Sequence, residues 1–199
     1  MEKIKLKYTS IDEKKDFLNV KFKEELLKEI ENTFLNIKET SPSFVRNAKN
    51  DKQAAIWYGE LDYKYGNYTP LVGLNFTDNM RKLSELIAEE LNIDKEFFNS
   101  CYVNRYNNGG IGRHHDNDKI FKKDKTWTGG SEIIVAVFSL GANANIFIFN
   151  DYHDKHILGK VETQDNHLYI MNKNFQNRLY HQVGASFGIR YSFTFRHTV

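Results

Sequence analysis

The stretch from Asn104 to Asp118, which reads NRYNNGGIGRHHDND, carries residues whose types and spacing could bind a metal ion. His114 and Asp116 are two residues apart, and in an extended segment such side chains point to the same side. An imidazole and a carboxylate would therefore converge on one point. A histidine from elsewhere in the chain would complete a 2-His-1-carboxylate set, which leaves coordination positions open on non-haem Fe(II).

The other histidines differ in how well they suit the role of third ligand. His115 alternates with His114 and should point away from the metal, and His197 is almost at the end of the chain. His153 and His156 lie in a polar turn, where surface histidines are expected. The remaining candidates, at positions 167 and 181, each begin or occupy an apolar segment, so spacing alone leaves both open.

The C-terminal segment RYSFTFR places polar side chains on one face of a predicted strand. Alternation puts Arg190, Ser192, Thr194 and Arg196 opposite the aromatic residues of the same segment. If this face lies inside a barrel, its charges need an anionic partner, because unpaired buried cations are costly. A small dicarboxylate suits the planar fork of arginine. The alternative is an edge strand whose polar face lies in water.

Asn104 and Tyr106 share one parity ahead of the histidine and aspartate pair. Both would point to one face, and an amide and a phenol can donate to a carboxylate or keto oxygen. A second group of aromatic residues lies in 56–68, where glycines indicate a hairpin. Its tyrosines either pack on the core or line a groove where a base stacks.

These residues must be positioned by helices and strands that the hydrophobic pattern predicts. Residues 1–8 alternate as a strand, and Ser10 with Glu13 forms a capping box for a helix through about residue 38. Asp78 is expected to cap a helix over 79–91. Strands are expected at 100–106, 132–140, 144–150, 157–163, 167–172, 179–184 and 189–197. This order predicts an α+β fold with a sandwich or jelly-roll core and its helices at the N-terminal end.

Composition limits the class of protein. The chain has 199 residues, 40% hydrophobic and 27% charged, which is typical of a globular protein with a substantial core. We expect one domain, 1–199, with an N-terminal strand and helix to about 55, a lid and second helix over 56–98, and a catalytic core over 99–199. No apolar run is long enough to span a bilayer. The single cysteine, Cys101, excludes an intrachain disulfide and predicts a reducing, intracellular compartment.

Taken in order, several short elements resemble the AlkB-like Fe(II)- and 2-oxoglutarate-dependent dioxygenases, which repair alkylated nucleobases. The resemblance runs from about Tyr58 to Arg196. Its elements are Asn104-Arg105-Tyr106, Ile111-Gly112 before His114-His115-Asp116, Phe138 to Gly141 with Phe147 to Phe149, Met171-Asn172, Tyr180-His181, and Arg190 to Arg196.

The resemblance implies a double-stranded β-helix, a form of jelly roll, and selects His181 as the third ligand. His114, Asp116 and His181 would bind Fe(II), and Arg190 would pair with the distal carboxylate of 2-oxoglutarate. The other cosubstrate contacts that it implies are Asn104, Tyr106, Ser192 and Arg196. With O2, such a site decarboxylates 2-oxoglutarate and hydroxylates a carbon next to nitrogen, after which the alkyl group leaves as an aldehyde.

The substrate implied by the resemblance is an alkylated base in DNA or RNA, single-stranded or flipped out. Its contacts would be Asp118, Tyr58, Tyr63, Tyr65 and Trp127, and the lysines beside Trp127 suit a nucleic-acid backbone. A monomer with no membrane partner is expected. The alternatives are the same oxygenase chemistry on a protein side chain or an unalkylated base, and a non-catalytic nucleic-acid-binding module.

Overall fold

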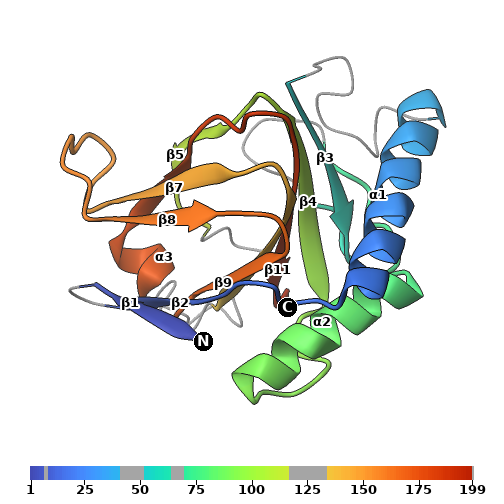
Figure 1. Cartoon of the computed structure of the whole chain (residues 1–199), viewed down its shortest axis with the longest axis horizontal. Coiled ribbons are helices and arrows are strands. Elements are labelled where there is room, and N and C mark those ends of the chain that lie inside the picture. The colour runs from blue at the N-terminus through green and yellow to red at the C-terminus, as the bar shows by residue number, and fades with distance from the viewer. Residues whose placement is uncertain (7–8, 41–51, 64–69, 117–133, 199) are drawn as a thin grey trace.

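Two antiparallel sheets face each other in the computed structural model, which describes residues 1–6, 9–40, 52–63, 70–116 and 134–198 (Figure 1). The sheet with more strands, the longer sheet, has seven strands in the order β1-β2-β9-β6-β11-β4-β3. The shorter sheet has four strands in the order β5-β10-β7-β8. The strands are β1 (Glu2–Lys5), β2 (Ser10–Lys14), β3 (Gln53–Tyr58), β4 (Ser100–Asn107), β5 (Ile111–His114), β6 (Val135–Gly141), β7 (Ala144–Phe149), β8 (Gly159–Thr163), β9 (His167–Met171), β10 (Tyr180–Val183) and β11 (Ile189–Arg196). This arrangement agrees with the predicted jelly-roll core.

The two faces of the longer sheet bury different kinds of side chain. On β11, Phe193 and Phe195 belong to a core cluster that also contains residues of the helices α1 (Val20–Thr40) and α2 (Asp78–Leu91). The alternate residues, from Arg190 to Arg196, face the shorter sheet. They are also buried, because β11 lies between β6 and β4. The polar face of this strand is therefore inside the barrel and not at a solvated edge.

Helix α1 forms where apolar residues recur every four positions. Phe22, Leu26, Ile30 and Phe34 lie on one side of it and are almost completely buried. In Figure 1, α1 and α2 lie on the side of the longer sheet opposite to β5, β7 and β8. A second core cluster fills the space between the two sheets. The helices thus support the sheet from outside and leave its inner face for the site.

Two local predictions were wrong. Ser10 and Glu13 do not cap a helix, because both lie in β2, which pairs with β1 and β9. The cap of α2 is Thr77, whose hydroxyl accepts a hydrogen bond from the Met80 N–H, and Asp78 is the first helical residue. The predicted hairpin over 56–68 falls partly on residues outside the described ranges, and within those ranges β3 pairs with β4.

The other predicted strands and both long helices are present. Helix α1 begins at Val20, ten residues after the predicted cap at Ser10, and the remaining ends differ by a few residues. The strands β2, β3 and β5 and the short helix α3 (Phe175–Arg178) are additions to the predicted elements. Within the described ranges, none of the helices is long and apolar enough to cross a membrane.

Candidate metal centre and adjoining cavity

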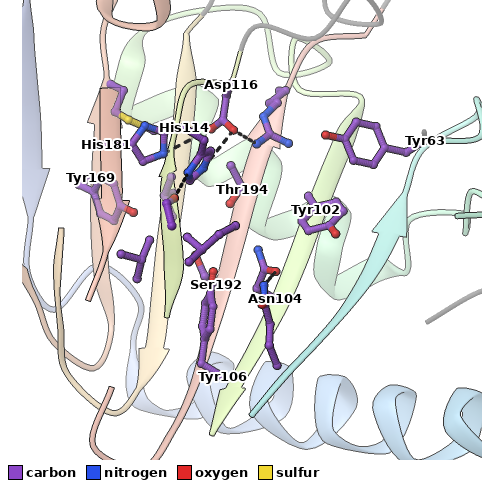
Figure 2. A pocket seen from close by; sticks show the side chains of 17 residues that line it. Tyr63, Tyr102, Asn104, Tyr106, His114, Asp116, Tyr169, His181, Ser192 and Thr194 are labelled. Atoms are coloured by element: carbon purple, nitrogen blue, oxygen red, sulfur yellow. Dashed lines mark hydrogen bonds and ion pairs between the residues drawn. The ribbon is translucent and has the colours of Figure 1, made fainter. Parts of the chain in front are cut away.

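Neighbouring strands of the shorter sheet bring the predicted ligands together. His181 on β10 is paired with His114 on β5, and their ring centroids are 4.2 Å apart. Asp116 follows two residues after His114 and turns to the same side. One ligand atom from each of the three residues lies within 4.8 Å of the others. Figure 2 shows the three side chains gathered at one place. The structure therefore assembles the facial triad and favours His181 over His167.

The turn between β4 and β5 makes this pairing possible. A Cβ on Gly110 would lie 2.3 Å from the Val183 carbonyl oxygen, which no side chain can occupy. The absence of a side chain there allows the turn to pass directly against the end of β10. His114 is then oriented locally, since its Nδ1 is 2.8 Å from the Gly112 carbonyl oxygen and must donate to it. Its Nε2 remains for a metal and faces the Asp116 Oδ1 at 3.7 Å.

Burial and charge favour the metal-binding forms of Asp116 and His181. Burial opposes ionisation of Asp116, but Arg196 and then the two histidines hold the pKa of its carboxyl well below its usual range. The Arg196 Nη2 is 2.8 Å from the Asp116 Oδ1. Burial, followed by the neighbouring His114, lowers the pKa of His181 to about 3. A carboxylate and a neutral imidazole are the forms that bind divalent metals.

A cavity of about 280 Å³ adjoins the triad. Its polar lining comes mainly from the inner face of the longer sheet, as Figure 2 shows. The Asn104 Oδ1 accepts from the Gln53 Nε2 at 3.2 Å, which leaves the Asn104 amide nitrogen as a donor toward the cavity. Among the predicted cosubstrate contacts, the lining residues are Asn104, Tyr106, Ser192 and Arg196. Arg196 is thus shared between the cavity and Asp116.

Arg190 lies behind this lining, next to Tyr106. It is completely buried, with its guanidinium 5.5 Å from the centre of the Tyr106 ring and its Nε 2.9 Å from the Ser139 hydroxyl. Its Nη1 and Nη2 are buried without a hydrogen-bond partner in the described part of the chain, although Arg190 acts on the nearby Tyr169 to lower its pKa. Because an unpaired buried guanidinium is costly, these atoms fit the carboxylate of a small dicarboxylic acid.

Two phenols near Arg190 remain protonated. Burial raises the pKa of Tyr169 to about 12 and raises that of Tyr106 further, while Arg190 opposes both shifts. Each hydroxyl can therefore donate a hydrogen bond at neutral pH.

The predicted substrate contacts fall into three groups. Tyr63 lines the cavity, stacks on Trp57 with ring centroids 4.8 Å apart, and meets Tyr102 edge-on at 5.3 Å. Tyr58 points to the other face of the sheet, into the core beside α1 and α2, where burial raises its pKa to about 12. Tyr58 is thus placed away from the cavity. The remaining candidates, Tyr65, Asp118 and Trp127, lie outside the described residues.

Sequence reasoning missed several residues of the site. Tyr102 shares the parity of Asn104, so the alternation along β4 could have identified it. Thr194, which the alternation of the C-terminal segment placed on the polar face, also lines the cavity. Tyr169 and Met171 also line the cavity, but from β9, whose position beside β6 only the fold shows. No pattern in the sequence points to Gln176, whose Oε1 accepts a hydrogen bond from the Asp116 N–H at 2.7 Å.

Comparison with known families identifies the chain. A model of the 2OG-Fe(II) oxygenase superfamily matches residues 14–196. The chain belongs to this superfamily. Membership and the triad together show an enzyme that uses Fe(II), 2-oxoglutarate and O2. A search of curated protein sequences gave no match.

The solved structure of OsALKBH1 is similar to this 2OG-Fe(II) oxygenase over nearly the whole fold. The TM-score is 0.65 at 15% sequence identity, and the match covers 94% of this chain and 97% of the other. The two proteins therefore share a fold, which agrees with the jelly roll that the sequence resemblance implied.

Proposed function

We propose that this oxygenase removes alkyl groups from N-alkylated bases in DNA or RNA. The observation that carries the proposal is an aromatic wall, Tyr63 with Tyr102, on the cavity that also holds His114, Asp116 and His181. A planar base stacks well on aromatic rings, by about 1 to 3 kcal/mol per base. The likeness of the fold to OsALKBH1 supports the same choice.

Each part of the site has a role in this reaction. Arg190, Tyr106 and Asn104 would hold the distal end of 2-oxoglutarate by charge and hydrogen bonds. The triad would hold Fe(II), which with 2-oxoglutarate and O2 supplies the oxidation that places a hydroxyl on the alkyl carbon. The Arg196 guanidinium orients the Asp116 carboxylate. The products would be succinate, carbon dioxide, the dealkylated base and an aldehyde.

A panel of methylated oligonucleotides tests the substrate class. The enzyme with Fe(II) and 2-oxoglutarate should release formaldehyde from at least one single-stranded DNA or RNA carrying an N-methylated base. Unmethylated oligonucleotides of the same sequence serve as controls. Succinate production without demethylation of any oligonucleotide would reject the proposal and favour a protein side chain or an unalkylated base.

The aromatic wall can be tested separately with Tyr63. Tyr63→Ala should raise the KM for the methylated oligonucleotide about 5- to 100-fold, which corresponds to the loss of one stacking contact. Tyr63→Phe retains the ring and is the matched control, expected within about twofold of the wild type. Equal losses in both variants would show that stacking on this ring does not bind the substrate.

A further inference from the structure

Asp116 is the one member of the triad whose backbone has no strand partner. His114 and His181 are paired with each other across β5 and β10, so the sheet sets their positions. Strand β5 ends at His114, and β5 lies at the edge of its sheet. The Asp116 residue is 8% exposed, so its N–H needs a hydrogen-bond acceptor from elsewhere in the protein.

The side chain of Gln176 supplies that acceptor. Its Oε1 is 2.7 Å from the Asp116 nitrogen, and its Nε2 is 3.5 Å from the Met171 Sδ. Gln176 is completely buried, so no water competes for either contact. It lies on α3, the short helix directly before β10. A segment that precedes His181 by a few residues therefore holds the backbone of the carboxylate ligand.

Phe175, the neighbour of Gln176 on α3, contacts His181, a different member of the triad. Phe175 is also completely buried and meets the His181 ring edge-on, with centroids 5.9 Å apart. One four-residue helix thus contacts both the carboxylate ligand and the distal histidine. Helix α3 is therefore placed to act on the position of Asp116 relative to His181.

We propose that Gln176 is a positioning residue of the metal centre, which holds Asp116 through its backbone N–H so that the carboxylate stays in register with His114 and His181. Groups that orient metal ligands from behind typically change metal affinity about 10- to 100-fold when they are removed. The backbone contact extends this principle, because it acts on the peptide of the ligand and leaves both carboxylate oxygens to the metal and Arg196.

Cobalt substitution tests the proposal independently of turnover. Gln176→Met keeps the length of the side chain but removes the acceptor. Its Co(II) affinity should fall about 10- to 100-fold, and the visible d–d bands of the Co(II) protein should change in position or intensity. Asn177→Ala is the matched control, since it alters an exposed residue of the same helix and should leave affinity and spectrum as in the wild type.

A purely structural role for Gln176 predicts a different outcome. Thermal stability would fall, but the folded protein would bind Co(II) with the affinity and spectrum of the wild type, and this result would overturn the proposal. If Gln176→Met does not fold, Gln176→Asn decides the question, because it retains the amide but withdraws it from Asp116 by one methylene. The expected change is then in the same direction and smaller, and an unaltered Co(II) spectrum would again overturn the proposal.

Discussion

The adjacent histidines at 114 and 115 show how strand alternation separates two identical side chains. His114 faces Asp116 and His181, whereas His115 stacks on Tyr180 with ring centroids 4.6 Å apart. Only one of them is therefore a candidate ligand, although the sequence offers both at the same place.

Because the two histidines point to different sides, their alanine variants should differ in metal binding. His114→Ala should abolish the visible charge-transfer band that forms when Fe(II) and 2-oxoglutarate are added without oxygen, because the triad loses a ligand. His115→Ala should retain the band at comparable intensity. Anaerobic absorption spectra of both variants provide the measurement. Loss of the band in the His115 variant alone would show that His115, and not His114, is the ligand.

Arg190 is a second residue with a testable role. Its Nη1 and Nη2 are buried and have no hydrogen-bond partner in the described part of the chain, so a carboxylate ligand would complete their hydrogen bonds. Arg190→Met should raise the KM for 2-oxoglutarate about 100-fold or more, since a bidentate charged contact contributes roughly 3 kcal/mol. Arg190→Lys retains the charge without the planar fork and should lie between this variant and the wild type. Initial rates of succinate formation at saturating Fe(II) provide the measurement. Wild-type KM values in both variants would exclude Arg190 as the carboxylate-binding group.

Among the elements, β11 shows most directly how one strand serves two purposes. Its aromatic residues join the core beneath α1 and α2, and its polar residues line the barrel. The helices matter to the site because they hold this sheet in place. Thr77 connects the two helices, since it caps α2 and its hydroxyl is also 2.5 Å from the Glu29 Oε1 on α1.

The capping role of Thr77 can be measured. Thr77→Ala should lower the free energy of unfolding by about 1 to 2 kcal/mol, because the Met80 N–H loses its acceptor and the contact with Glu29 is lost. Asp78→Ala removes only a favourable charge in the first turn and should cost roughly 0.5 kcal/mol. Urea unfolding of both variants checks the order. A larger loss of unfolding free energy in Asp78→Ala than in Thr77→Ala would show that Asp78 is the capping residue, as the sequence predicted.

At the scale of the whole molecule, a buried histidine links the fold to pH. His167 is completely buried on β9, with its Nε2 3.5 Å from the Glu13 Oε2 on β2. Burial, followed by Lys15 and Arg190, lowers its pKa from 6.5 to about 4, whereas burial raises the pKa of Glu13. His167 is therefore neutral in the folded protein at pH values where the unfolded chain already binds a proton.

The sign of the pH effect follows from this difference. Between pH 6.5 and 4 the unfolded state binds more protons through His167 than the folded state, so this contribution to stability is lost as the pH falls. The loss should amount to about 3 kcal/mol, since the pKa falls from 6.5 to about 4 and one pKa unit corresponds to about 1.4 kcal/mol.

His167→Asn removes the titrating group and should make the pH dependence shallower by that amount. Urea unfolding of both metal-free proteins at a series of pH values is the measurement. His181 and Glu13 titrate in both proteins, so only the difference reports on His167. Parallel pH profiles would contradict the prediction.

The sequence by itself determined the residues with local patterns. The two-residue spacing of His114 and Asp116, the alternation of β11 and the helical repeat of α1 all follow from periods of the backbone, so they could be predicted from neighbours along the chain. The pair of metal ligands, the polar inner face of β11 and the long helices could therefore be predicted from the sequence. The choice of His181 came from the family resemblance and agrees with the pairing of β5 and β10.

Only the tertiary structure decided which distant segments meet. Ser10 and Glu13 have the spacing of a helix cap, but pairing with β9 outweighs that local preference. Tyr58 and Tyr63 are equally aromatic, yet only Tyr63 lines the cavity, because β3 turns Tyr58 toward the helices. The Asp116 N–H donates a hydrogen bond to Gln176, which is 60 residues away in the sequence. Such a contact depends on how the sheets and α3 pack, and no period of the chain predicts it.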